Sequence, residues 1–145
     1  MIHSYAVMFL IMLVTGFLTT MNLAVDSWTD IRWSLNDLYM ILTMTGWMLV
    51  FMAALNQDWW IMAAAFVLVA ASIWAIRIQF LISTDQYVMG MIPHHSMAVH
   101  MSRQLVASPS PSTGPLKEFA LQIIKNQENE IAFMKEWAAR KAVSL

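Results

Sequence analysis

The chain has 145 residues, of which 59% are apolar and 12% are charged, and its net charge is −1. Soluble domains average about 45–50% apolar and about 25% charged residues, so this composition excludes a disordered chain, a nucleic-acid-binding protein and most soluble enzymes. The lack of cysteine excludes disulfides, zinc fingers and iron–sulfur clusters, which leaves 14 methionines and 4 histidines to supply any metal chemistry.

Three apolar stretches in the first part of the chain satisfy the length of a membrane-spanning helix, which is about 20 residues. None of them contains Asp, Glu, Lys or Arg, and they cover Ile2–Val25, Leu38–Gln57 and Trp59–Ile76. The connections are short, and four tryptophans at positions 28, 33, 59 and 60 suit the level of the lipid headgroups. Three spans place the N-terminus and the C-terminal region on opposite sides of the bilayer.

The second span carries a row of methionines, one every four residues, at Met40, Met44, Met48 and Met52. A row of thioethers is what a path for Cu(I) would use. Methionine is also a flexible filler between packed helices, and no histidine or acid joins this row. The packing interpretation is therefore favoured.

The remaining residues, 83–145, hold six of the eight basic residues and are predicted to form a soluble domain, separate from the membrane region at 1–82. Ser83 or Thr84 can cap a helix that runs to about residue 106 and is expected to kink at Pro93. A loop rich in Pro and Ser follows at 107–115, and a second helix runs from about 116 to 142. The sequence thus predicts an all-α membrane protein: three transmembrane helices followed by an antiparallel pair of soluble helices.

Side chains that can bind a soft metal are concentrated between Met89 and Met101. On a helix, Met91, His94 and Met101 share a face. Glu130 and Met134 of the second helix can face the same groove. We expect the kink to turn both histidines toward that helix, with His94 as the primary ligand. The predicted ligands are His94, His95, Met91, Met101, Glu130 and Met134.

Imidazoles and thioethers with one carboxylate favour copper, because zinc sites use more nitrogen or carboxylate ligands. Zinc, or no metal at all, is the alternative. In that case the two histidines are an ordinary hydrated pair and the methionines pack a core.

Part of this region resembles a known bacterial family, the domain-of-unknown-function family 305. The resemblance lies in Met91-Ile-Pro-His-His-Ser96, followed on the next helix by Gln127, Glu130-Ile131 and Met134-Lys135. The pair Arg77-x-Gln79 looks like the membrane-anchored branch of that family. This resemblance implies a ferritin-like helical domain, often extracytoplasmic, with copper binding suggested for secreted relatives.

We expect a membrane-anchored protein without enzymatic activity that binds copper and buffers it or delivers it in the cell envelope. The alternative is a structural accessory subunit of a larger membrane complex, in which the His/Met cluster is only a packing core. A ferritin-like iron oxidase is disfavoured, because no Glu stands three residues before any histidine.

The expected location is the inner (plasma) membrane, with the C-terminal domain in the periplasm. The arginines near the spans predict the opposite orientation by the positive-inside rule, but the family resemblance and the methionine-rich chemistry outweigh a bias of two or three residues. Besides the lipid bilayer, we expect a homodimer or another membrane protein as partner, and no nucleic acid. The two helices carry more apolar surface than they can bury against each other, namely Leu105, Phe119, Ile123, Ile131 and Trp137.

Overall fold

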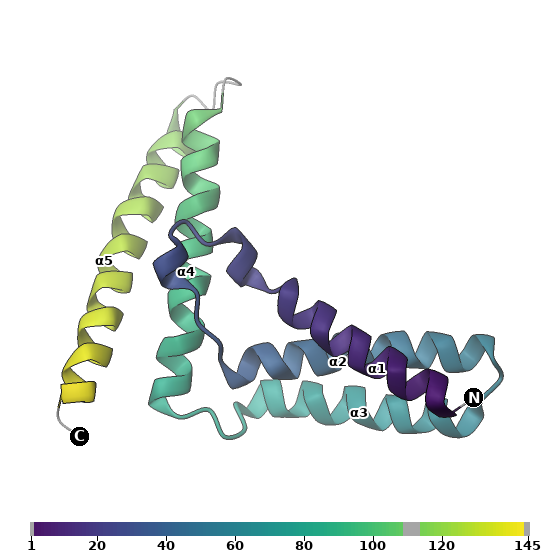
Figure 1. Ribbon diagram of the computed structural model, residues 1–145. Helices are drawn as coiled ribbons and strands as arrows, with labels where there is room; N and C mark the ends of the chain where they lie inside the picture. The colour runs from purple at the N-terminus through teal and green to yellow at the C-terminus, as the bar shows by residue number, and fades with distance from the viewer. Residues whose placement is uncertain (1, 109–113, 144–145) are drawn as a thin grey trace. The chain divides into compact units, whose positions relative to one another are not determined.

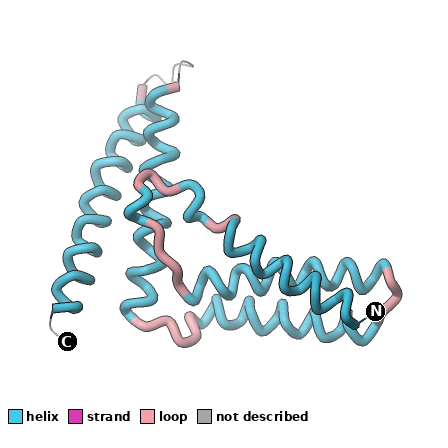
Figure 2. The backbone as a smooth tube through the Cα atoms, in the orientation of Figure 1, coloured by secondary structure: helices cyan, strands magenta, loops and turns pink. Residues whose placement is uncertain are grey.

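The computed structural model describes residues 2–108 and 114–143, and within these ranges the chain consists of helices and loops without any strand (Figure 2). The prediction of an all-α protein is confirmed for this part of the chain. The elements, labelled in Figure 1, are α1 (Ile2–Leu18), η1 (Met21–Ala24), η2 (Trp28–Asp30), α2 (Leu35–Leu55), α3 (Trp59–Ile78), α4 (Thr84–Ala107) and α5 (Pro115–Val143).

Three helical stretches are long and apolar enough to cross a membrane: Ser4–Ala24, Leu35–Leu55 and Trp59–Ile78. The chain divides into two compact units. The spanning unit contains the chain up to Thr20 and residues Ser34–Ile82. The C-terminal unit contains the chain from Ser83 onward and also Met21–Trp33, which we call the interspan segment.

The first helix ends earlier than the sequence predicts, at Leu18 instead of Val25. At about 1.5 Å per residue, its 17 residues span about 26 Å, which is at the short end of the range for a membrane helix. The apolar residues that follow, Met21–Ala24, form a short 3-10 helix that contacts α4. Hydropathy alone cannot distinguish apolar residues that face lipid from apolar residues that pack on a neighbouring helix.

The second helix begins at Leu35, three residues before the predicted start, because Ser34 and Asp37 form a capping box. The Ser34 N–H donates to Asp37 Oδ2 over 2.8 Å, and the Ser34 hydroxyl accepts from the Asp37 N–H. Such a box satisfies N–H groups that would otherwise lack partners at the start of the helix. The expected short connection between α2 and α3 is a tight turn, with Gln57 in the left-handed region at φ 56°.

The second and third helices pack closely through small residues. A Cβ atom at Gly46 would lie 2.6 Å from Val69 Cγ2, so only glycine fits there. Thr45, Ala53 and Ala65 are buried at the same helix pair. Small residues at helix contacts are typical of membrane proteins, where close backbone approach replaces the hydrophobic driving force that water supplies.

The C-terminal unit contains the predicted antiparallel pair of α4 and α5 (Figure 1). The Ser83 hydroxyl caps α4 by accepting the N–H of Gln86. The helix continues through Pro93 to Ala107, so the proline removes a backbone hydrogen bond without ending the helix. Of the predicted loop at 107–115, residues 109–113 lie outside the described residues.

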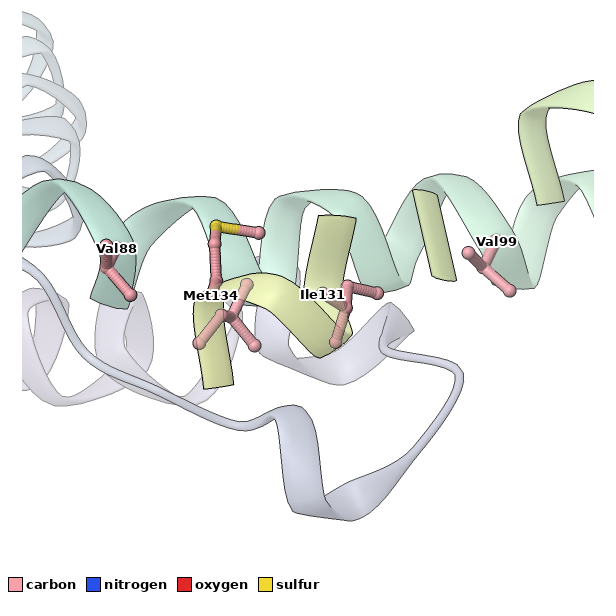
Figure 3. Close-up of a cluster of buried hydrophobic side chains, with 5 residues drawn as sticks. Val88, Val99, Ile131 and Met134 are labelled. Atoms are coloured by element: carbon pink, nitrogen blue, oxygen red, sulfur yellow. The ribbon is translucent and has the colours of Figure 1, made fainter. Parts of the chain in front are cut away.

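The apolar core of this unit is small and lies between α4 and α5 (Figure 3). Its buried members are Val88, Ile92, Val99, Ile131 and Met134, and Met91, Ile124 and Trp137 pack against them. In Figure 3, Met134 and Ile131 of α5 lie against α4 between Val88 and Val99. The spacing of these residues by three, four and seven follows the helical repeat, as predicted from the sequence.

The interspan segment folds back on itself before it meets the helices. The side chain of Asn22 donates to the carbonyl of Arg32 over 2.8 Å and accepts the N–H of Arg32 over 3.2 Å. Ser27 caps the short helix η2. The predicted division at residues 82 and 83 counted this segment with the membrane region, whereas it packs as part of the C-terminal unit.

Candidate functional site

Three consecutive residues of α4 point in three different directions. Each step along a helix rotates the side chain by about 100°. His94 is exposed, the side chain of His95 is 12% exposed and faces α5, and Ser96 is fully buried against the interspan segment. At this one turn of α4, His94 therefore faces solvent, His95 faces α5 and Ser96 faces the interspan segment.

The second histidine faces a carboxylate of α5. His95 Nδ1 lies 2.9 Å from Glu130 Oε2, which is an ion-pair distance, although the two groups do not meet the angular requirement of a hydrogen bond. Burial lowers the pKa of His95; the charge of Glu130 opposes this shift, and His94 adds to it. A carboxylate beside Nδ1 favours the tautomer that leaves Nε2 as the free donor atom.

The two imidazole rings lie close together, with ring centres 5.9 Å apart and planes inclined by 59°. A metal–nitrogen bond of about 2.0 Å puts an ion roughly 3 Å from the centre of each ligating ring. Rings with centres 5.9 Å apart can therefore share one ion only when one nitrogen of each ring is turned toward it and the ion lies nearly midway between the rings.

Met91 lies one helical turn before both histidines, at three residues from His94 and four from His95. Side chains on a helix lean toward its N-terminus, so both imidazoles extend over the turn that carries Met91. The Met91 side chain is half-buried beside the core. Met91, His94 and His95 thus form one group of potential donors, which we call the Met–His–His group.

The other predicted ligands lie elsewhere. Met134 is 8% exposed and belongs to the apolar core between α4 and α5. Met101 is 62% exposed and stands two helical turns, about 10 Å, beyond His94. His94 does not turn toward α5, and His95 faces Glu130 in its place. This corrects the expected arrangement, because a buried proline within a continuous helix does not redirect a neighbouring side chain by 100°.

Within residues 2–108 and 114–143, no group of three or more His, Cys, Asp or Glu side chains is placed to hold a metal.

A buried polar cluster lies directly beside the Met–His–His group. The Ser96 hydroxyl donates to Asp30 Oδ2 over 2.7 Å and accepts the backbone N–H of Asp26 over 2.9 Å. Lys135 of α5 pairs with Asp30 and donates to the Thr29 hydroxyl over 3.3 Å. Arg103 bridges Asp26 and Glu128. These contacts tie α4, α5 and the interspan segment into one structure.

This cluster was not predicted from the sequence, although its signals are visible afterwards. A serine amid large residues on a helix is a candidate for a buried polar contact, and Asp26 and Asp30 are two of the four acidic residues before position 83. Their partners are up to 105 residues away along the chain, which no local pattern reveals. The cluster borders a cavity of about 260 Å³ lined by Ser96, Glu128 and Lys135 among others.

Comparison with known proteins gives two matches. Residues 83–142 match the family described as "Domain of unknown function (DUF305)". An "Uncharacterized protein L153" of Acanthamoeba polyphaga mimivirus is 42% identical over 123 residues, which cover 81% of this chain and 80% of the viral protein. A match of that length extends beyond the C-terminal unit into the spanning helices. No solved structure matches.

Proposed function

This chain belongs to the DUF305 family, and from the geometry of its C-terminal unit we propose that it is a membrane-anchored copper-binding protein. In this proposal, Met91, His94 and His95 bind the ion, and Glu130 orients His95 from the side. The protein buffers copper or hands it on in the cell envelope and catalyses no reaction. The three apolar helices serve as the anchor in the inner membrane, and the C-terminal unit faces the periplasm.

The observation that carries this proposal is the 5.9 Å between the ring centres of His94 and His95, with a thioether one turn away from both. Two imidazoles and one thioether are a donor set for Cu(I), which accepts soft ligands and low coordination numbers. Zinc binds thioether sulfur poorly, so this set favours copper. The carboxylate of Glu130 beside Nδ1 is the kind of second partner that fixes the orientation of metal-ligating histidines.

Competition for Cu(I) against a chromophoric chelator, with the full chain in lipid nanodiscs, tests the proposal. We expect His94→Ala and His95→Ala each to lower the affinity by at least about 100-fold, and Glu130→Gln by about 10- to 100-fold. Met101→Leu is the matched control, because Met101 lies on the same helix but out of reach. An unchanged Cu(I) affinity in the double variant His94→Ala/His95→Ala would contradict the proposal.

A structural accessory subunit is the second candidate, and the exposed aromatic surface of α5 favours it. Phe119 is 57% and Phe133 is 68% exposed, so another protein or a second copy could cover them. This function expects no copper in the purified protein and a loss of assembly, with unchanged metal content, in Phe119→Ser/Phe133→Ser.

A C-terminal alkaline phosphatase fusion tests the proposed orientation. An inactive fusion, together with a fluorescent fusion to green fluorescent protein, would place the C-terminal unit in the cytoplasm instead.

A further inference from the structure

A second hollow lies within the spanning unit, at the end where α1 begins and α2 ends. It has a volume of about 60 Å³ and is lined by Ser4, Tyr5, Met8, Met52 and Asn56. This volume holds one ion or one to two water molecules. No residue of the C-terminal unit contributes to it.

Two thioethers from different helices meet in this hollow. Met8 comes from α1 and Met52 from α2, and both side chains are half-buried. The other methionines of the row on α2 are more exposed, at 54% for Met40, 40% for Met44 and 41% for Met48. The row is therefore not one continuous path, and Met52 is the member that shares a cavity with a second methionine.

The hollow also contains a buried phenol. Tyr5 is 9% exposed, and its hydroxyl makes no hydrogen bond of normal geometry with the described residues, although the side chains of Asn56 and Asp58 lie close enough to act on it. An occupant of the hollow would give this hydroxyl a well-placed partner and recover part of the free energy of its burial.

The charge beside the hollow suits a monovalent cation. The carboxylate of Asp58 acts electrostatically on Tyr5, and its side chain makes no capping hydrogen bond at the start of α3. One negative charge balances one positive charge, so a singly charged ion avoids most of the cost of burying a net charge. Thioether sulfur discriminates against hard monovalent cations such as Na⁺ and favours Cu(I).

We infer that this hollow is a Cu(I) site, with Met8 and Met52 as the ligands and with the Tyr5 hydroxyl and the Asp58 carboxylate beside them. The site is separate from the Met–His–His group in position and in ligands. Its lining includes two thioether sulfurs, whereas the Met–His–His group includes two imidazoles, so the two sites have different spectroscopic signatures.

The test uses the full chain in nanodiscs with the C-terminal group removed by Met91→Leu/His94→Ala/His95→Ala. Under anaerobic titration with Cu(I), this background variant is expected to retain one equivalent of copper, with sulfur and no imidazole in its X-ray absorption spectrum. Adding Met8→Leu/Met52→Leu should remove that equivalent. Adding Met44→Leu/Met48→Leu, the control on the exposed part of the same row, should leave it in place.

Selenomethionine labelling provides a measurement that needs no substitution in the hollow. Copper bound to labelled background protein should show copper–selenium scattering. Absence of that scattering, or a background variant that binds no copper, would overturn the inference and leave a water molecule as the occupant of the hollow. A different outcome would overturn the function proposed for the C-terminal unit. In that outcome, the background variant still binds its copper, and copper bound to the wild type shows only sulfur ligands.

Discussion

The two units of this protein are held together by different means. In the spanning unit, α2 and α3 approach closely at small residues such as Gly46 and Ala65, and the described side-chain hydrogen bonds lie within one helix or near helix ends. In the C-terminal unit, a short apolar core is supplemented by a buried cluster around Asp30 and Ser96. The difference matches the solvents proposed for the two units, which are lipid and water. Without water, helices gain stability from close packing, whereas a small domain in water adds buried polar contacts to a limited core.

The largest effect should come from removing the carboxylate at the centre of the polar cluster. Asp30→Ala leaves Lys135 without its partner and Ser96 without its acceptor. We expect a loss of about 2–3 kcal/mol in the free energy of unfolding of the C-terminal unit, less than for a fully buried pair because Lys135 is 36% exposed. Amide hydrogen exchange of α4 and α5 measures it.

The matched control for this change is Asp85→Ala, which breaks the exposed pair with Lys141. Both of its side chains are nearly half exposed, so the loss should stay within about 0.5 kcal/mol. Equal losses of unfolding free energy in the two variants would show that the buried cluster stabilises the unit no more than an exposed ion pair does.

Overpacking the contact between α2 and α3 should affect only the spanning unit. Gly46→Leu places side-chain atoms where Val69 already stands, and we expect a loss of about 1–3 kcal/mol. Ala64→Leu, at an exposed position of α3, is the control and should be nearly neutral. Thermal unfolding in nanodiscs distinguishes them. A neutral Gly46→Leu would mean that close approach is not what holds these helices.

Acid should weaken the C-terminal unit through His95. Burial lowers the pKa of His95 below its value in the unfolded chain, about 6.5, so the unfolded state takes up the proton first. The stability of this unit is therefore expected to be full above about pH 6.5 and to fall as the pH drops from there toward the folded-state pKa. Hydrogen exchange of α4 at a series of pH values follows this loss. His95→Gln should flatten the dependence, whereas His94→Gln should reduce it only slightly, because burial is the main cause of the shift and the charge of His94 is a minor one. The reverse pattern would contradict the assignment.

The smallest effect on stability is expected from the exposed aromatics of α5. Phe119→Ser/Phe133→Ser should change the free energy of unfolding by less than about 0.5 kcal/mol, because neither ring is in the core. The predicted homodimer should dissociate, however, which sedimentation in detergent detects. A wild type that is already monomeric and protected from proteolysis argues against the dimer.

Much of the architecture follows from local patterns. The ends of α4 depend on the Ser83 cap and on the serine- and proline-rich stretch after it, and both are readable in the sequence. The early start of α2 is also local, since Ser34 and Asp37 have the spacing of a capping box with Asp in place of Glu. The lengths of apolar runs located α2 and α3 within a few residues.

The candidate site could be predicted only in part. The helical repeat correctly places Met91 and His94 within one turn of each other. It cannot tell which histidine faces α5, because that depends on the rotation of α4 about its own axis, and the packing of Val88, Ile92 and Val99 sets that rotation. Contacts such as Lys135 with Asp30 depend in addition on the register between α5 and the interspan segment.

The interspan segment has a consequence for how the protein is made. Thr29 is translated 106 residues before Lys135, the residue of α5 that binds it. The C-terminal unit is thus discontinuous in the chain, and the ribosome must pass Lys135 before the unit can close. A fragment that starts at Ser83 lacks one of the three parts that bury Ser96, so expression of the isolated helix pair yields an incomplete domain.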